Sequence, residues 1–98
     1  MGNIIVVASI KVKNECIDEV YGELVKLYKA THTYDEGVVY YELHKEIGTD
    51  NCFTFIETWE NEELLLVHEK KDYFLDFIAN LENKLESLSV QKLEKVEL

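Results

Sequence analysis

Four separate parts of the chain have the pattern of a β-strand, either as alternation with period two or as a short run that is apolar on both faces. These parts are residues 3–12, 38–45, 53–59 and 88–98. The first begins as a run that is apolar on both faces. The last alternates in two registers, which predicts a bulge near Gln91 and Lys92. A turn-forming segment at 47–51 joins the second and third strands into a predicted hairpin.

Apolar residues recur with helical spacing between the first two strands. Asn14 is a good N-cap for a helix from Glu15 to about Thr31, and Glu36-Gly37 is expected to end that segment. The apolar stripe of this helix comprises Ile17, Val20, Tyr21, Leu24, Leu27 and Tyr28.

The third strand leads directly into a second helical segment. Asn61 is its predicted N-cap, two glutamates suit its first turn, and it ends on His68. A break at residues 70–72 precedes a further helix. Its predicted apolar face carries Phe74, Phe77, Ile78, Leu81 and Leu85.

The resulting order, β-α-β-β-α-β, predicts an α+β fold of ferredoxin-like type, built as one domain over residues 1–98. Its sheet would be antiparallel, with the helices on one face. Both faces of the strands are apolar, however, as Ile5 and Val7 beside Ile4 and Val6 illustrate. We therefore expect a homodimer in which two sheets pack face to face, while the pattern leaves open which face meets the partner.

Charge narrows the class of ligand. Twenty acidic residues oppose ten basic ones, giving a net charge of −10, and every basic residue is a lysine. The acidity argues against nucleic acid as a partner, and the lack of arginine disfavours a phosphorylated ligand. A neutral or weakly charged small molecule is expected.

The sequence contains no recognisable membrane span, signal peptide or cysteine motif. No apolar run approaches the roughly 20 residues of a membrane span, and the start lacks the features of a signal peptide, so the expected partners exclude membranes and the expected location is the cytoplasm. Cys16 and Cys52 stand far apart and form neither a metal nor a redox motif.

The candidate chemistry gathers around the third strand and the helix that follows it. His68 suits a general base, or it merely satisfies the last carbonyls of its helix. Glu57 and Trp59 share a strand face. The carboxylate suits orientation of a histidine and the indole a ligand wall, although a core tryptophan with a glutamate that pairs across the sheet is the simpler explanation. His44 shares a face with Glu42, opposite Tyr41.

Two groups of residues resemble the antibiotic biosynthesis monooxygenase family over nearly the whole chain. The first group is Ile56-Glu57-x-Trp59-Glu60, Leu65, His68 and Tyr73-Phe74, and the second is Glu36-Gly37-x-x-x-Tyr41-Glu42-Leu43. Tyr73 stands where many members have a second histidine. The resemblance implies a dimeric α+β barrel like that of quinol monooxygenases, with a pocket near Trp59 and His68.

Members of this family include monooxygenases that oxidise phenols, anthrones or quinols without metal or flavin. The resemblance implies His68 as base, Tyr41 or His44 as hydrogen-bond donor and Trp59 as pocket wall. It implies a substrate site that also includes Glu57, Phe55, Tyr73 and Phe74, and a small aromatic or quinone-like ligand. A non-catalytic binding dimer and a family-type isomerase are the alternatives, although the absence of arginine disfavours the isomerase.

No cofactor is expected. The haem-degrading branch of the family uses a residue set that is missing here, since Ile78 falls near its axial histidine. No glycine-rich phosphate loop is present for flavin or nicotinamide. The three histidines and two cysteines are scattered over different predicted elements, which disfavours a metal centre.

Overall fold

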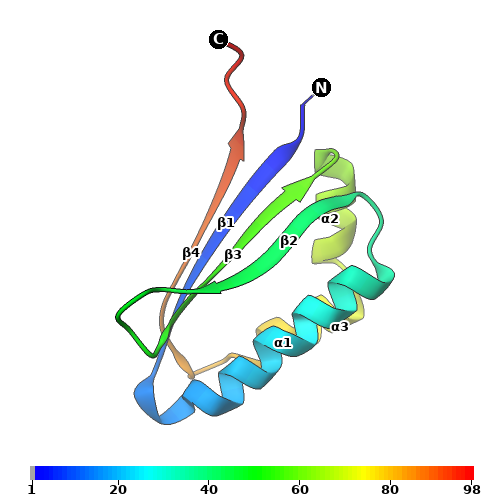
Figure 1. Cartoon of the computed structure of the whole chain (residues 1–98). Helices are drawn as coiled ribbons and strands as arrows, with labels where there is room; N and C mark the ends of the chain where they lie inside the picture. Colours follow the sequence, from blue (N-terminus) through cyan, green and yellow to red (C-terminus); the bar gives the residue numbers. More distant parts are fainter. Residues whose placement is uncertain (1) are drawn as a thin grey trace.

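The structure, a computed structural model, describes residues 2–98 and consists of four strands and three α-helices (Figure 1). The elements in chain order are β1 Ile4–Val12, the short 3₁₀ helix η1 Asn14–Cys16, α1 Ile17–Tyr34, β2 Val38–Lys45, β3 Cys52–Trp59, α2 Glu62–Glu69, α3 Asp72–Asn80 and β4 Leu85–Glu94. No helix within residues 2–98 is both long and apolar enough to cross a membrane.

The strands form one sheet in the order β2-β3-β1-β4, and all three pairings are antiparallel. The helices lie together on one face of the sheet (Figure 1). Both features confirm the predicted ferredoxin-like α+β fold. Register places Tyr41, Glu57, Val6 and Lys92 in one row across the four strands.

Helix α1 begins and ends later than predicted. The prediction that Asn14 caps it is wrong, because residues 14–16 form a separate 3₁₀ turn and Cys16 occupies the N-cap position without a side-chain hydrogen bond. The helix continues past Thr31 to Tyr34. This extension brings the following residue, Asp35, to the level of α2.

The start of α2 is confirmed, since the Asn61 side chain accepts a hydrogen bond from the Leu64 backbone N–H at 2.9 Å. Gly37 packs against this helix start with φ of +81°, a conformation that favours glycine. A Cβ atom at Gly37 would overlap the Leu64 side chain. The break before α3 is also confirmed.

Three predictions about the C-terminal strand are wrong. The strand spans Leu85–Glu94 and not residues 88–98. Leu85 does not extend the apolar face of α3, because it is the first residue of β4. The register shift occurs between Lys11 and Val12 of β1, opposite the first residues of β4, while Gln91 and Lys92 keep regular pairing.

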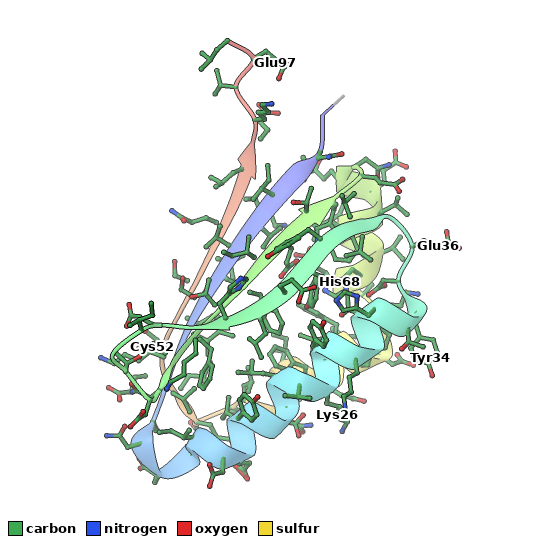
Figure 2. All side chains as sticks on the ribbon, in the orientation of Figure 1. Lys26, Tyr34, Glu36, Cys52, His68 and Glu97 are labelled. Atoms are coloured by element: carbon green, nitrogen blue, oxygen red, sulfur yellow. The ribbon has the colours of Figure 1, made fainter. Side chains whose placement is uncertain are left out.

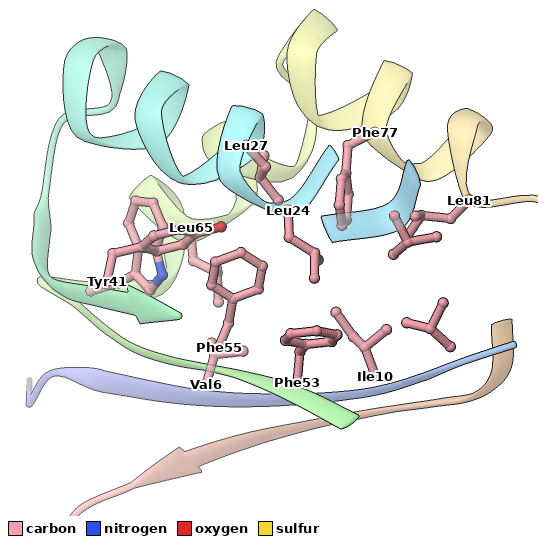
Figure 3. Close-up of a cluster of buried hydrophobic side chains, with 13 residues drawn as sticks. Val6, Ile10, Leu24, Leu27, Tyr41, Phe53, Phe55, Leu65, Phe77 and Leu81 are labelled. Atoms are coloured by element: carbon pink, nitrogen blue, oxygen red, sulfur yellow. The ribbon is translucent and has the colours of Figure 1, made fainter. Parts of the chain in front are cut away.

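The core lies between the helices and one face of the sheet. Figure 3 shows side chains of β1 and β3 meeting those of α1 and α3, with Val6 and Phe53 on one side and Leu24 and Phe77 on the other. The open face of the sheet is partly apolar, and Ile56 is 36% exposed there.

Candidate functional site

The most enclosed ion-pairing contact in the structure joins Asp35 to His68. Their side chains are each 2% exposed, and Asp35 Oδ2 lies 2.6 Å from His68 Nδ1. A carboxylate only accepts hydrogen bonds, so Nδ1 carries the hydrogen and donates it. Nε2 is then the ring nitrogen with a free lone pair. Burial lowers the pKa of His68, which Asp35 opposes, and the imidazole is neutral at neutral pH.

Figure 2 shows His68 on the helix side of the sheet. Three aromatic rings pack against its imidazole. Ring centroids lie 4.6 Å away for Trp59, 4.9 Å for Phe74 and 5.6 Å for Tyr41. These contacts hold the ring in one orientation and exclude water from it.

A second buried carboxyl group belongs to Glu57, which is 5% exposed. Its Oε1 accepts a hydrogen bond of 2.8 Å from the Trp59 indole N–H. Burial raises the pKa of Glu57 to about 7, against the lowering effect of that hydrogen bond. The carboxylate that orients His68 is therefore Asp35 and not Glu57.

A cavity of about 80 Å³ lies between the sheet and the helices beside these groups. His68, Tyr41, Glu57 and Glu69 supply its titratable lining. The remaining lining residues are apolar: Val6, Ala8, Ile10, Leu27, Phe55, Leu65, Phe74, Phe77, Ile78, Leu81, Leu88 and Val90. An apolar space with a few convergent polar groups is typical of a small-molecule site.

Tyr41 contributes a hydroxyl group that has no hydrogen-bond partner within residues 2–98, although it is fully enclosed. The Thr31 hydroxyl is also buried and without a hydrogen-bond partner within residues 2–98. Burial and then the Glu57 charge raise the pKa of Tyr41, so the phenol stays protonated and can donate. The proximity of the Thr31 hydroxyl lowers the pKa of Tyr41 to a lesser extent. An enclosed hydroxyl without a partner marks a position for a ligand or water oxygen. Tyr41 lines the cavity, whereas Thr31 and Asp35, which also act on its hydroxyl, do not.

The cavity approaches the surface between α3 and β4. Ile78, Leu88 and Val90 line it and are each about half exposed, at 45%, 50% and 52%. Lys92 of β4 bridges to Glu69 of α2, with Nζ 3.4 Å from Oε2. This edge carries the most exposed apolar residues of the cavity lining.

Five of the residues predicted for the site come together around the cavity: His68, Tyr41, Glu57, Phe55 and Phe74. Trp59 does not line it but stacks on His68.

The other two predicted residues, His44 and Tyr73, do not line this cavity. His44 is on the open face of the sheet, where its Nδ1 lies 3.2 Å from the Thr54 carbonyl oxygen. Tyr73 lines a separate small hollow between α1 and α3 with Lys26 and Asp76. It nevertheless lies beside the Asp35–His68 pair, since burial and then the neighbouring Asp35 carboxylate raise the pKa of Tyr73.

Asp35 is the residue that the sequence analysis missed. It lies 33 positions from His68 and directly follows α1. The sequence feature that could have indicated Asp35 is its position directly before Glu36-Gly37, the pair expected to end the first helix.

No group of three or more histidine, cysteine or acidic side chains within residues 2–98 is arranged to hold a metal ion. The expectation that the protein uses no cofactor stays a prediction.

Comparison with known proteins identifies the class. The family model described as "Antibiotic biosynthesis monooxygenase" matches residues 3–80. The chain is 32% identical over 76 residues to a Bacillus subtilis (strain 168) protein named "Putative monooxygenase YcnE", covering 78% of this chain and 79% of that protein. The chain belongs to the antibiotic biosynthesis monooxygenase family.

Solved structures share the fold. PA3566 from Pseudomonas aeruginosa superposes with a TM-score of 0.90 at 23% identity, covering 99% of this chain and 97% of that one. A conserved protein from Methanosarcina mazei Go1 gives 0.89 at 27% identity, covering 98% and 95%. A protein from Caulobacter crescentus CB15, described as a "putative antibiotic biosynthesis monooxygenase", gives 0.89 at 23% identity, covering 98% and 92%.

Proposed function

We propose that this protein is a cofactor-independent monooxygenase that oxidises a small electron-rich phenol or hydroquinone. The observation that carries the proposal is the enclosed Asp35–His68 pair, which presents a neutral imidazole at the wall of an apolar cavity. Membership of the family supports a monooxygenase-like role, and the substrate class is our inference.

The first step is removal of a proton from the substrate hydroxyl group. His68 Nε2 accepts this proton, and the Asp35 carboxylate stabilises the imidazolium ion that results. The apolar surroundings favour this base, since burial lowers the pKa of His68 and leaves it unprotonated. The phenolate that forms is rich enough in electrons to react with oxygen.

Tyr41 is the hydrogen-bond donor for the phenolate oxygen in this proposal. Its hydroxyl is enclosed, protonated and without a partner within residues 2–98. A donor placed in advance at a developing negative charge stabilises the transition state strongly when water is excluded. Of the two predicted donors, Tyr41 lines the cavity and His44 does not.

The oxidation balances without a further reductant. A hydroquinone and O2 give a hydroxyquinone and water: one oxygen atom enters the ring, and the other leaves with two hydrogens from the substrate. The four electrons that O2 takes up all come from the substrate. The protein needs only a base, a donor and a dry pocket.

The present cavity limits the substrate. Its volume of about 80 Å³ is below the roughly 150 Å³ of a cavity that admits benzene. Binding therefore requires the edge between α3 and β4 to move. The side chains that would be displaced are the half-exposed Ile78, Leu88 and Val90.

We also propose a homodimer formed through the open face of the sheet. Three strands contribute apolar residues to that face, including Tyr40 at 44%, Ile56 at 36% and Leu93 at 46% exposure. A second copy would cover them.

Oxygen consumption with a panel of hydroquinones tests the proposal. The wild type is expected to consume oxygen above the rate without protein, and His68→Ala to lose at least about 100-fold in kcat. His44→Ala is the matched control, because His44 lies outside the cavity. Equal rates for His68→Ala and His44→Ala would reject His68 as the base.

A second candidate is ligand binding without turnover, for which the apolar cavity with its few polar groups is sufficient. It predicts that hydroquinones bind and that oxygen is not consumed.

A further inference from the structure

Glu57 is a buried acid that the proposed reaction does not use. It lines the cavity and is 5% exposed. None of the ion pairs formed within residues 2–98 includes its carboxyl group. An isolated carboxylate in such a place is costly, and the neutral acid is the cheaper form.

The groups that face Glu57 come from several elements. Across the sheet these are Tyr41 on β2 and, beyond Val6, Lys92 on β4, while α2 contributes His68 and Glu69. Lys92 is already paired with Glu69. Burial raises the pKa of Glu57 most, the indole hydrogen bond lowers it, and the Glu69 charge raises it further.

Trp59 decides where the acid proton sits. The indole N–H only donates, and it occupies Oε1 at 2.8 Å. The proton of the neutral acid therefore resides on Oε2, the oxygen that remains for other partners.

We infer that Glu57, as a neutral carboxylic acid, donates a hydrogen bond from Oε2 to an acceptor oxygen of the ligand in this cavity. The ligand is thereby specified further: it is an aromatic molecule that carries a carbonyl or phenolate oxygen. The inference rests on the proposed substrate site but not on turnover. Glu57 acts here in recognition, separately from proton removal by His68.

The first test uses the indole N–H resonance of Trp59, the single tryptophan of the chain. Because this N–H is bonded to Glu57, its chemical shift is expected to titrate with a midpoint of about 7. Glu57→Gln keeps an oxygen acceptor for the indole and should abolish the titration. A wild-type midpoint near 4.5, the ordinary value for glutamate, would overturn the inference.

The second test compares two probes of nearly equal shape by NMR titration. Acetophenone carries a carbonyl acceptor, and α-methylstyrene carries a methylene group in its place. Wild-type affinity for acetophenone should fall about fivefold between pH of about 6 and about 8.5, as Glu57 ionises. Affinity for α-methylstyrene should stay within about twofold.

Glu57→Gln separates this effect from the titration of His68. Its amide still donates a hydrogen bond and does not ionise, so the fall in acetophenone affinity should disappear. A fall that persists in Glu57→Gln would assign the effect to another group and overturn the inference. The same holds if wild type binds both probes with equal pH dependence.

The outcomes distinguish this inference from the proposed function. The predicted probe pattern without oxygen consumption supports the recognition role and rejects the monooxygenase. Oxygen consumption without the predicted probe pattern supports the monooxygenase and rejects the recognition role of Glu57. Failure of both probes to bind overturns the cavity as a ligand site and therefore this inference.

Discussion

Asp35 Oδ2 and His68 Nδ1 lie 2.6 Å apart, although the two residues are 33 positions apart in the chain. The contact joins the end of α1 to the last turn of α2 and fixes Nδ1 as the imidazole nitrogen that carries the hydrogen. Lys71 Nζ lies 3.9 Å from the other carboxylate oxygen of Asp35. The carboxylate is thus held between two cationic or donor groups and keeps its orientation.

Replacing Asp35 by asparagine is expected to disable the base while preserving the cavity. Asparagine has nearly the same shape but cannot stabilise the imidazolium ion electrostatically. We expect kcat for hydroquinone oxidation to fall at least about 100-fold and KM to change less than about threefold. Asp50→Asn, in the exposed hairpin loop, is the control. Unchanged kcat in Asp35→Asn would remove Asp35 from the mechanism.

Glu57 makes stability depend on pH. Its folded pKa of about 7 lies above the ordinary 4.5, so its contribution is fully present below pH 4.5 and is lost as pH rises through 7. A rise of the Glu57 pKa from 4.5 to about 7 corresponds to about 3 kcal/mol in the free energy of unfolding. Urea denaturation measures the free energy of unfolding of wild type and Glu57→Gln at a pH of about 4.5 and of about 8. As pH rises, the difference between the two proteins should change by up to about 3 kcal/mol in favour of Glu57→Gln, because only wild type loses the Glu57 contribution.

Exposed Glu86 provides the control for that comparison. Glu86→Gln should track wild type at both pH values. If Glu57→Gln does the same, the Glu57 carboxyl group is not held in its neutral form by burial.

Two glycines should respond oppositely to alanine. Gly37→Ala must place a Cβ against Leu64 with φ at +81°, and we expect a loss of about 1–3 kcal/mol in the free energy of unfolding. Gly22 lies within α1 with free space around it, so Gly22→Ala should gain about 0.5–1 kcal/mol. Chemical denaturation of both variants measures the pair, and a stable Gly37→Ala would contradict the packing of α2.

The proposed homodimer predicts a specific effect of Ile56→Lys. A lysine in the middle of the open sheet face would place a charge in the interface, so light scattering at micromolar concentration should show monomers. Ile47→Lys is the control, because Ile47 is 99% exposed in the hairpin loop. A wild type that is already monomeric would refute the dimer.

Local patterns were sufficient to predict most of the fold. The limits of β2 agree residue for residue, and Asn61 caps α2, because strand alternation and N-capping depend on neighbours in sequence. The same alternation placed His44 on the face opposite Tyr41, as the structure does.

What the sequence could not predict depends on contacts between distant segments. The Asp35–His68 pair requires the length of α1 to be known to within one turn, and that length was underestimated. The register shift lies between Lys11 and Val12 of β1, opposite the first residues of β4, and the pattern of β4 alone does not reveal it. The indole bond to Glu57 depends on side-chain rotation and not on spacing.

The most direct test of the central claim follows the two atoms of ¹⁸O2 during oxidation of a hydroquinone by metal-depleted wild-type protein. We predict one labelled oxygen in the hydroxyquinone, the other in water, and loss of both in His68→Ala. Unlabelled quinone with all the label recovered as hydrogen peroxide, or labelled product at the same rate from His68→Ala, would contradict the account.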